Sequence, residues 1–355
     1  MWFGSTPPPP AATYKGPPLS SAYIFTAIAG VLLVLYKLQN KSKSSSPRFL
    51  PPVGTEKRSY ELWVLKYSVV WMGTFGVVIA FQIYEYLDAL GYFVLCGGLA
   101  LPLLLQPLLS GTAPHAARAQ LWIAIFGFIG NYWYTHYFYC VLRANYTMPA
   151  WRLNDVPIAM YSATHFYFSS YHVFANLPMR HVSRAGPPRP ASPAHNCICS
   201  AAPARCSPLR ALCLDARFAL ARQVRTAYAP GAMRNALEVG LVLAMSYATA
   251  FMETLTISNF PYYDFEDRDM AYTVGSAFYG LYFVVSFPVY LRLDEAAPTG
   301  GAAKAAGAGT SLLDAAASSL ASGMAVLMLL DLTRLAVVGT PLTIGGKLVE
   351  ITHGG

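Results

Sequence analysis

Seven long apolar segments constrain the fold of this chain more than any other feature of its sequence. Each is about 20 residues long, the length at which an α-helix crosses the hydrocarbon core of a bilayer. They lie near residues 65–84, 89–109, 119–142, 157–177, 234–257, 271–291 and 312–338. Charged residues make up only 12% of the chain, about half of their share in soluble proteins. The sequence therefore predicts an all-α fold, a polytopic membrane helical bundle of about seven to eight transmembrane helices.

An eighth apolar run, 22–36, decides how the N-terminus is interpreted. It is short for a span, and the first acidic residue of the chain is Glu56. Residues 1–59 are therefore a leader that holds either a signal-anchor helix or a targeting segment. We favour the signal anchor, because no small-residue cleavage site follows Tyr36.

Lys and Arg residues gather in one set of connections between the apolar segments. If all eight runs cross the membrane, the connections 37–66, 110–118, 178–234 and 292–311 share one side and hold 19 of the 25 Lys and Arg residues. Positively charged connections stay in the cytoplasm. The net charge of +8 is thus explained by membrane topology, and we expect no nucleic-acid partner.

Residues 183–222 differ in composition from everything around them. They are rich in Pro, Ala, Arg and Cys without periodicity, which predicts a disordered insert. The insert separates a first part of the bundle, 60–182, from a second part, 223–340, and a tail, 341–355, follows. It holds four of the six cysteines, but their spacing is only a weak metal signal and we expect no metal site.

Ionisable side chains inside the apolar segments are the candidates for chemistry, because a charge there costs about 2.5–3.5 kcal/mol on insertion scales. Glu253 is the acidic candidate. His165 and His172 lie on one face of the helix predicted near 157–177, and His136 lies on the helix before it, near 119–142. These helices present polar faces that would converge in a packed bundle. The alternative is that the polar residues only form hydrogen bonds between helices. In that case Glu253 would be a carboxylate at the edge of the membrane.

Burial in an apolar bundle disfavours the carboxylate anion, so Glu253 is expected to hold a proton at neutral pH. A neutral carboxyl beside imidazoles, phenols and aromatic faces suits acid and base chemistry on an apolar substrate. The chain has no His-rich box, Gly-rich dinucleotide fingerprint, Walker motif or G-x-S-x-G elbow. We therefore expect a rearrangement that uses no cofactor.

Three blocks of sequence resemble the cycloeucalenol cycloisomerase family, also called cyclopropyl sterol isomerases. They are LWIAIFGFIGNYWYTHYFYCVLRANYTMPAWRLNDVP, THFYFSSYHVFAN and METLTISNFPYYDFEDRDMAYTVGSAFYGLYFVVSFPVYLRLDE. The resemblance implies a multi-pass enzyme of the endoplasmic reticulum membrane. It also implies that this enzyme opens the 9β,19-cyclopropane ring of cycloeucalenol to give the Δ8 sterol obtusifoliol. The leader and the 183–222 insert depart from the family pattern, and we hypothesise that the insert is a translated intron.

For that reaction, our candidate proton donor is Glu253, and His136, His165 or His172 would accept or relay the second proton. The competing assignment is an imidazolium donor with Glu253 as its partner. The candidate substrate-binding residues are aromatic and amide side chains: Tyr134, Tyr137, Asn131, Asn259, Tyr262 and Tyr263. Tyr262 and Tyr263 are expected to cap the site, or else to anchor the chain at the membrane interface. The expected partners are the sterol and membrane lipid, and two other function classes remain open, a transporter and an inactive sterol-binding protein.

Overall fold

The computed structural model describes residues 19–40, 49–109, 113–135, 144–182, 232–257, 260–265, 271–295, 310–337, 342–344 and 347–349. The long helices are α1 (Leu19–Asn40), α2 (Glu56–Ala80), α3 (Ala89–Leu109), α4 (Ala113–Ile129), α6 (Ile158–Val182), α8 (Ala232–Ile257), α10 (Ser276–Arg292) and α12 (Leu312–Val337). The prediction of a mostly helical chain is confirmed. The 183–222 insert and three candidate site residues, His136, Tyr137 and Asn259, lie outside the described residues.

Short elements connect the long helices. η1 (Ile83–Tyr86) is a 3-10 turn, and η2 (Gly130–Tyr134) and η3 (Ala271–Gly275) are π-helical turns that continue α4 and lead into α10. Three antiparallel strand pairs complete the structure. They are β1 (Ala144–Tyr146) with β4 (Tyr263–Phe265), β2 (Arg152–Leu153) with β3 (Val156–Pro157), and β5 (Leu342–Ile344) with β6 (Lys347–Val349).

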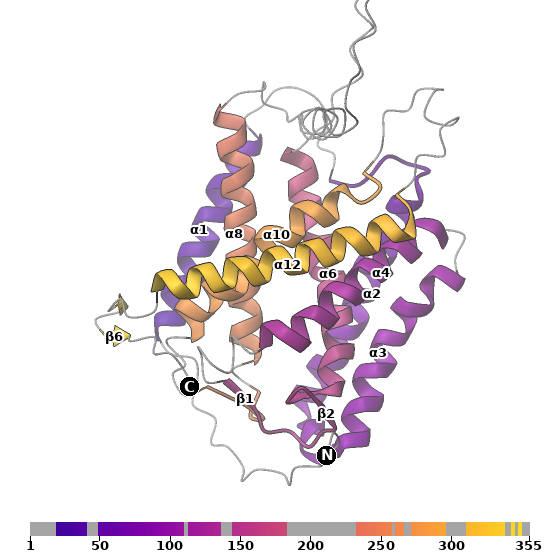
Figure 1. Ribbon diagram of the computed structural model, residues 1–355, viewed down its shortest axis with the longest axis vertical. Coiled ribbons are helices and arrows are strands. Elements are labelled where there is room, and N and C mark those ends of the chain that lie inside the picture. Colours follow the sequence, from indigo (N-terminus) through magenta and orange to yellow (C-terminus); the bar gives the residue numbers. More distant parts are fainter. Residues whose placement is uncertain are drawn as a thin grey trace, which may run out of the picture.

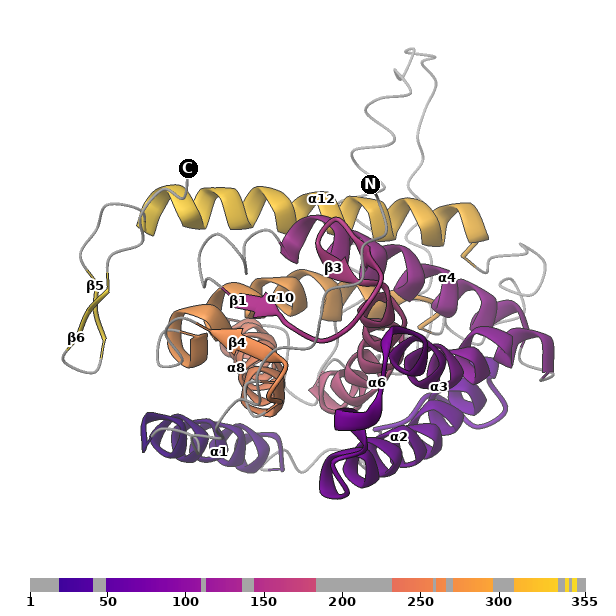
Figure 2. The same cartoon turned by 90° about the horizontal axis from the view of Figure 1, so that it is seen from below.

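The helices form a bundle with α12 on one side and α1 and α2 on the opposite side, and α6, α8 and α10 lie between them (Figures 1 and 2). α12 runs across the bundle, steeply inclined to α8 (Figure 1). It packs against α4 and α10, while α6 contacts α2, α3, α4, α8 and α10. Because α6 is surrounded by these helices, the polar residues that were predicted to lie on one of its faces are buried.

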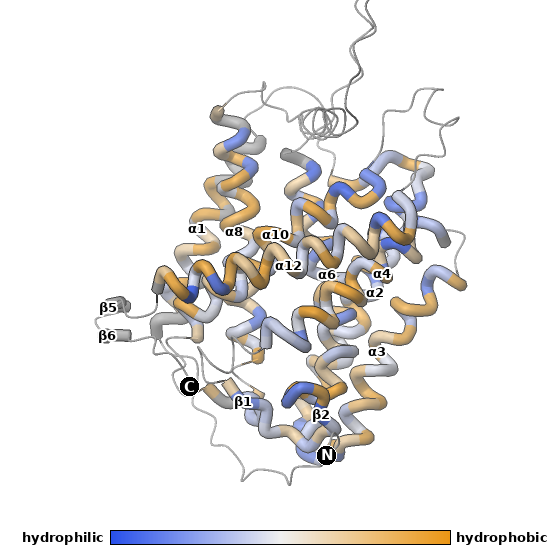
Figure 3. Tube along the Cα trace, viewed as in Figure 1, coloured by the Kyte–Doolittle hydropathy of each residue, from blue (hydrophilic) through white to orange (hydrophobic). Residues whose placement is uncertain are grey.

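Within the part of the chain that the structure describes, five helical segments are long and apolar enough to cross a membrane: 56–80, 89–108, 235–257, 271–292 and 312–336. α4 is only 17 residues long, because η2 interrupts its regular hydrogen bonding. In α6 the buried histidine, serine and asparagine side chains lower the hydropathy. Apolar residues dominate the middle of α3 and α8, whereas hydrophilic residues concentrate towards helix ends and connections (Figure 3). The chain is therefore a membrane protein.

The contact between α12 and α4 depends on Gly323. A Cβ atom at this position would lie 2.8 Å from Cδ1 of Ile129 and 3.1 Å from the hydroxyl of Tyr134. That hydroxyl donates a hydrogen bond to the Gly323 carbonyl at 2.8 Å. Both contacts require the two helices to approach more closely than a larger residue permits.

Replacing Gly323 with alanine is therefore expected to lower the stability of the folded protein by about 1–3 kcal/mol, as overpacking does in other cores. Thermal unfolding of the detergent-solubilised protein measures the effect. Gly98→Ala in α3 is the control, because a Cβ there meets nothing within 4 Å. Equal melting temperatures for the two variants would show that the close approach at Gly323 contributes nothing to stability.

Candidate active site

Glu253 lies in the last turns of α8 and is bonded by phenols. The hydroxyl of Tyr279, from α10, donates a hydrogen bond of 2.6 Å to its Oε2 atom. The phenol of Tyr171, from α6, lies within hydrogen-bonding range of the same carboxyl. Three helices thus meet at one carboxyl group, but α6 contributes Tyr171 there, whereas His165 and His172 of its predicted polar face bond other residues. The convergence of these histidines with Glu253 stays a prediction.

Aromatic rings extend from this carboxyl towards η2. The Tyr279 ring lies 4.9 Å from Tyr282 and 5.1 Å from Phe283, measured between ring centroids. Tyr282 in turn lies 4.5 Å from Tyr134, the candidate of η2. Because the Tyr134 hydroxyl is used by Gly323, Tyr134 offers its ring face rather than its phenol to this region. Aromatic faces of this kind stabilise positive charge.

The β1–β4 ribbon covers the same end of the bundle. Tyr146 of β1 pairs with Tyr263 of β4, and their rings lie 4.5 Å apart. Burial raises the pKa of Tyr146 well above its usual range, and the neighbouring Tyr263 and the charge of Glu253 add to the rise. The ribbon therefore lies close enough to Glu253 for the two groups to interact.

Tyr262 points away from that pair. Its hydroxyl donates a hydrogen bond of 2.9 Å to Oε2 of Glu85 in η1. Its ring packs against Tyr84 and Phe260, with centroids 6.1 and 5.7 Å away. Of the two predicted capping tyrosines, Tyr263 thus lies on the side of Glu253 and Tyr262 holds the ribbon to η1.

His172 is fully buried, and both of its ring nitrogens are occupied. Nδ1 donates to the carbonyl of Phe168 at 2.8 Å, and the hydroxyl of Ser286 donates to Nε2 at 2.9 Å. These two bonds fix the neutral tautomer that carries its proton on Nδ1. The rings that pack around His172 within about 6 Å are Trp122, Phe126, Phe168, Phe283, Phe287 and Tyr290.

His165 lies two turns before His172 on the same face of α6 and is buried against α4. Its Nε2 atom lies 2.6 Å from Oε1 of Gln120, whose amide nitrogen donates to the Tyr60 hydroxyl at 2.8 Å. Nε2 therefore carries the proton and Nδ1 keeps a lone pair. Asn131 has a similar place between helices. It donates to the carbonyl of Gly127 and accepts a bond from the hydroxyl of Thr164.

Among the described residues, the groups bonded to the Glu253 carboxyl are phenols and not imidazoles. Sequence analysis did not single out Tyr171 or Tyr279, because the chain has 24 tyrosines and nothing in the pattern marks these two. The available signal was the spacing of Tyr279, Phe283, Ser286 and Tyr290 along one face of α10, which places that face in the core.

The chain is similar over most of its length to the cycloeucalenol cycloisomerase of Arabidopsis thaliana. The two sequences are 33% identical over 304 residues, which cover 83% of this chain and 91% of the relative. The chain belongs to the cycloeucalenol cycloisomerase family. No protein-family model matches the chain, and no solved structure matches it either.

Membership in the cycloeucalenol cycloisomerase family confirms the resemblance found in the three sequence blocks. It also confirms, at the level of the family, that the chain is an isomerase related to sterol metabolism.

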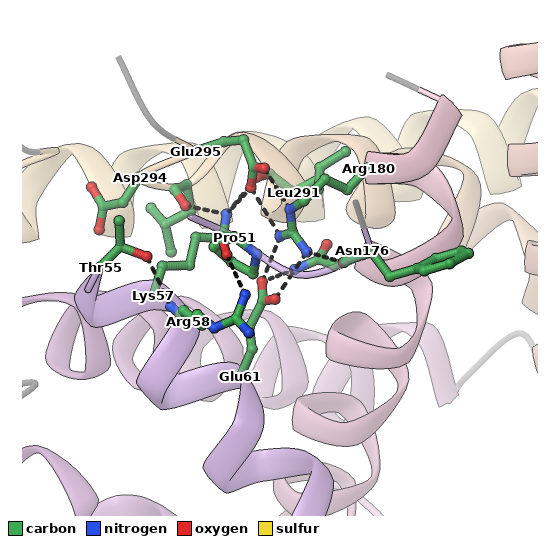
Figure 4. Close-up of polar contacts among 12 residues, drawn as sticks. Pro51, Thr55, Lys57, Arg58, Glu61, Asn176, Arg180, Leu291, Asp294 and Glu295 are labelled. Carbon is green, nitrogen blue, oxygen red and sulfur yellow. Dashed lines mark hydrogen bonds and ion pairs between the residues drawn. The ribbon is translucent and has the colours of Figure 1, made fainter. Parts of the chain in front are cut away.

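A cluster of charged side chains lies at the end of the bundle opposite the β1–β4 ribbon. Figure 4 shows its polar contacts. Arg180 of α6, only 7% exposed, lies between Glu61 of α2 and Glu295 after α10, with shortest N–O distances of 2.7 and 2.5 Å. Lys57 binds Glu295 at 2.8 Å. It also donates to the carbonyls of Leu291 and Leu293. Every charge in this cluster has an opposite charge beside it, which is the arrangement of a structural network.

A second group of ionisable residues, His115, Arg118 and Asp294, joins α4 to this end. Nδ1 of His115 and Nε of Arg118 both donate to Oδ2 of Asp294 at 2.7 Å. Burial alone would raise the pKa of Asp294, but these two donors hold it below its usual range. The two groups tie together described residues from all four Lys- and Arg-rich connections. That these connections lie on one side of the membrane stays a prediction.

Proposed function

We propose that this chain is a cycloeucalenol cycloisomerase, which opens the 9β,19-cyclopropane ring of cycloeucalenol and yields obtusifoliol. The observation that carries the proposal is the 33% identity to the Arabidopsis cycloeucalenol cycloisomerase over 91% of that relative. The carboxyl held by phenols in an aromatic surrounding is the chemical feature that this reaction needs.

The reaction moves protons and transfers no electrons. A proton adds to C19, the C9–C19 bond breaks, and positive charge forms at C9. A proton then leaves C8, its electron pair forms the C8–C9 double bond, and the product is an isomer of the substrate. The protein must therefore supply an acid, a base and stabilisation of a transient cation.

Glu253 is the proposed acid. Glu253 lies in a helix that is long and apolar enough to cross the membrane, and its carboxyl accepts a hydrogen bond from Tyr279. When it releases its proton to C19, the remaining carboxylate balances the positive charge at C9. The ring faces of Tyr134 and Tyr263 are the proposed aromatic contacts of the cation, with Tyr137 as a further candidate. Asn131, Asn259 and Tyr262 remain proposed contacts of the sterol.

For the base, the hydrogen bonds favour His165 over His172. Both nitrogens of His172 are bonded within the protein, so accepting a proton there requires Ser286 to turn its hydroxyl away. His165 binds Gln120 through Nε2, and no described residue is bonded to Nδ1, which would accept the proton from C8 or relay it. His136 stays a candidate of equal standing by sequence.

We further infer that the chain resides in the endoplasmic reticulum membrane with seven to eight spans. In this arrangement α4, α6 and α1 cross the bilayer beside the five strongly apolar helices. The many helix contacts of α4 and α6 support this, because a helix face that packs on other helices inside a membrane bundle can carry polar residues. The substrate, an apolar sterol, dissolves in the same lipid phase.

Membranes that contain this chain are expected to convert cycloeucalenol to obtusifoliol, as read by mass spectrometry of the extracted sterols. In D₂O the product should carry one deuterium in its C19 methyl group, because the proton added to C19 comes from an exchangeable carboxyl. Membranes of the same host without the chain are the control. Binding of cycloeucalenol without product would identify a sterol-binding protein instead, and ion-dependent flux in vesicles would identify a transporter.

A further inference from the structure

We propose that Tyr279 is a positioning residue, which with Tyr171 orients the Glu253 carboxyl and stabilises the anion that remains when the proton leaves. The inference rests on the proposed function and adds a role for two residues that the sequence did not single out. Neither phenol needs to touch the sterol for this role.

The Tyr279 phenol is held in a fixed position. The residue is only 6% exposed, and its ring is packed between Tyr282 and Phe283. At the next residue, Gly280, α10 packs closely against α8, since a Cβ there would lie 3.6 Å from the backbone of Ser246, in van der Waals contact. The hydroxyl therefore reaches Glu253 from a rigid helix pair, and the bond length of 2.6 Å is that of a strong oxygen–oxygen hydrogen bond.

The two phenols would make Glu253 a stronger proton donor than a buried carboxyl without such hydrogen bonds. A carboxyl buried in an apolar bundle keeps its proton, which makes it a weak donor to a carbon–carbon bond. Hydrogen bonds from phenols are about twice as strong to a carboxylate as to a neutral carboxyl. They therefore stabilise the state after proton release more than the state before it. Interactions that strengthen along the reaction in this way accelerate the chemical step.

Removing the hydroxyl alone tests this role. Tyr279→Phe is expected to lower kcat about 10- to 100-fold with little change in KM, the size expected for one hydrogen bond to a charged group. The alkaline limb of the pH profile of kcat should move to higher pH, because a carboxyl with one donor fewer keeps its proton longer. A structural defect would lower kcat at every pH without moving the limb.

Tyr282→Phe is the matched control. Tyr282 is equally buried and lies next to Tyr279, but its hydroxyl donates to the backbone carbonyl of Tyr134 at 3.2 Å and not to the carboxyl. Its removal should leave the pH profile in place and kcat within about threefold of wild type. If Tyr279→Phe does not fold, Tyr171→Phe removes the other phenol and takes the same tests.

Infrared spectroscopy separates this proposal from the proposed function. The carbonyl stretch of protonated Glu253, assigned by its loss in Glu253→Gln, should move to higher frequency in Tyr279→Phe and stay in place in Tyr282→Phe. An unmoved band would overturn the positioning role whether or not the wild-type protein turns sterol over. A moved band with full kcat would show that the phenol binds the carboxyl without serving the reaction. A moved band in a protein that forms no obtusifoliol would refute the isomerase, and with it any catalytic role of Tyr279.

Discussion

Glu253→Gln is expected to abolish the conversion of cycloeucalenol, with a loss of about 100- to 10,000-fold, the usual contribution of a general acid. Glutamine keeps the size of the side chain and its hydrogen bond from Tyr279, but it has no proton to give to C19. Sterol extraction and mass spectrometry at equal protein level measure the loss. Turnover close to wild type would transfer the role of the acid to a histidine.

Glu238→Gln is the control for that experiment. Glu238 lies in the first turns of the same helix, 15 residues before Glu253, and the substitution makes the same chemical change at the opposite end of α8. Turnover by this variant should stay within about threefold of wild type. A comparable loss in both variants would indicate damage to α8 rather than removal of the acid.

Arg180→Ala should have the largest effect on stability, a loss of about 3–5 kcal/mol, because it leaves Glu61 and Glu295 without their shared partner in a buried place. Glu61 is only 1% exposed and its remaining partner is the amide of Asn176. Thermal unfolding in detergent and the yield of folded protein report the change. Arg58→Gln is the control, since among the described residues the Arg58 side chain binds the carbonyl of Pro51 and no carboxylate. Similar melting temperatures for both variants would show that the network does not stabilise the bundle.

Most helix positions could be predicted from hydropathy. The predicted segments 89–109, 234–257 and 312–338 agree with α3, α8 and α12 within two residues at either end, and 271–291 agrees with η3 and α10 taken together. The agreement is poorer elsewhere: α4 begins six residues early, α6 ends five residues late, and α2 begins at Glu56, nine residues before the prediction. Its first turns carry Lys57 and Glu61, which a hydropathy window rejects. Ion pairs with α6 and the end of α10 allow them to be buried.

Contacts between distant parts of the sequence could not be predicted. Arg180 finds Glu61 and Glu295 more than 100 residues away in either direction, and no local pattern encodes such pairs. The β1–β4 pairing is of the same kind, since it joins residues 144–146 to 263–265. Glu253 itself could be found, because a carboxyl in an apolar segment is rare enough to be noticed by its cost. Its partners Tyr171 and Tyr279 could not, because tyrosine is common in this chain and its role depends on what its hydroxyl meets.

The position of Glu253 inside a membrane-crossing helix affects how such an enzyme has to be assayed. Glu253 is partly exposed as a residue, and its neighbour Met252 lies on the outer surface of α8, 41% exposed. The ribbon of β1 and β4 covers the end of the bundle nearest to it. For the proposed sterol substrate, this arrangement predicts an approach to the carboxyl from the plane of the bilayer. The concentration that saturates the enzyme is then the mole fraction of sterol in lipid, and diluting the membrane with inert phospholipid should slow turnover as diluting a soluble substrate does.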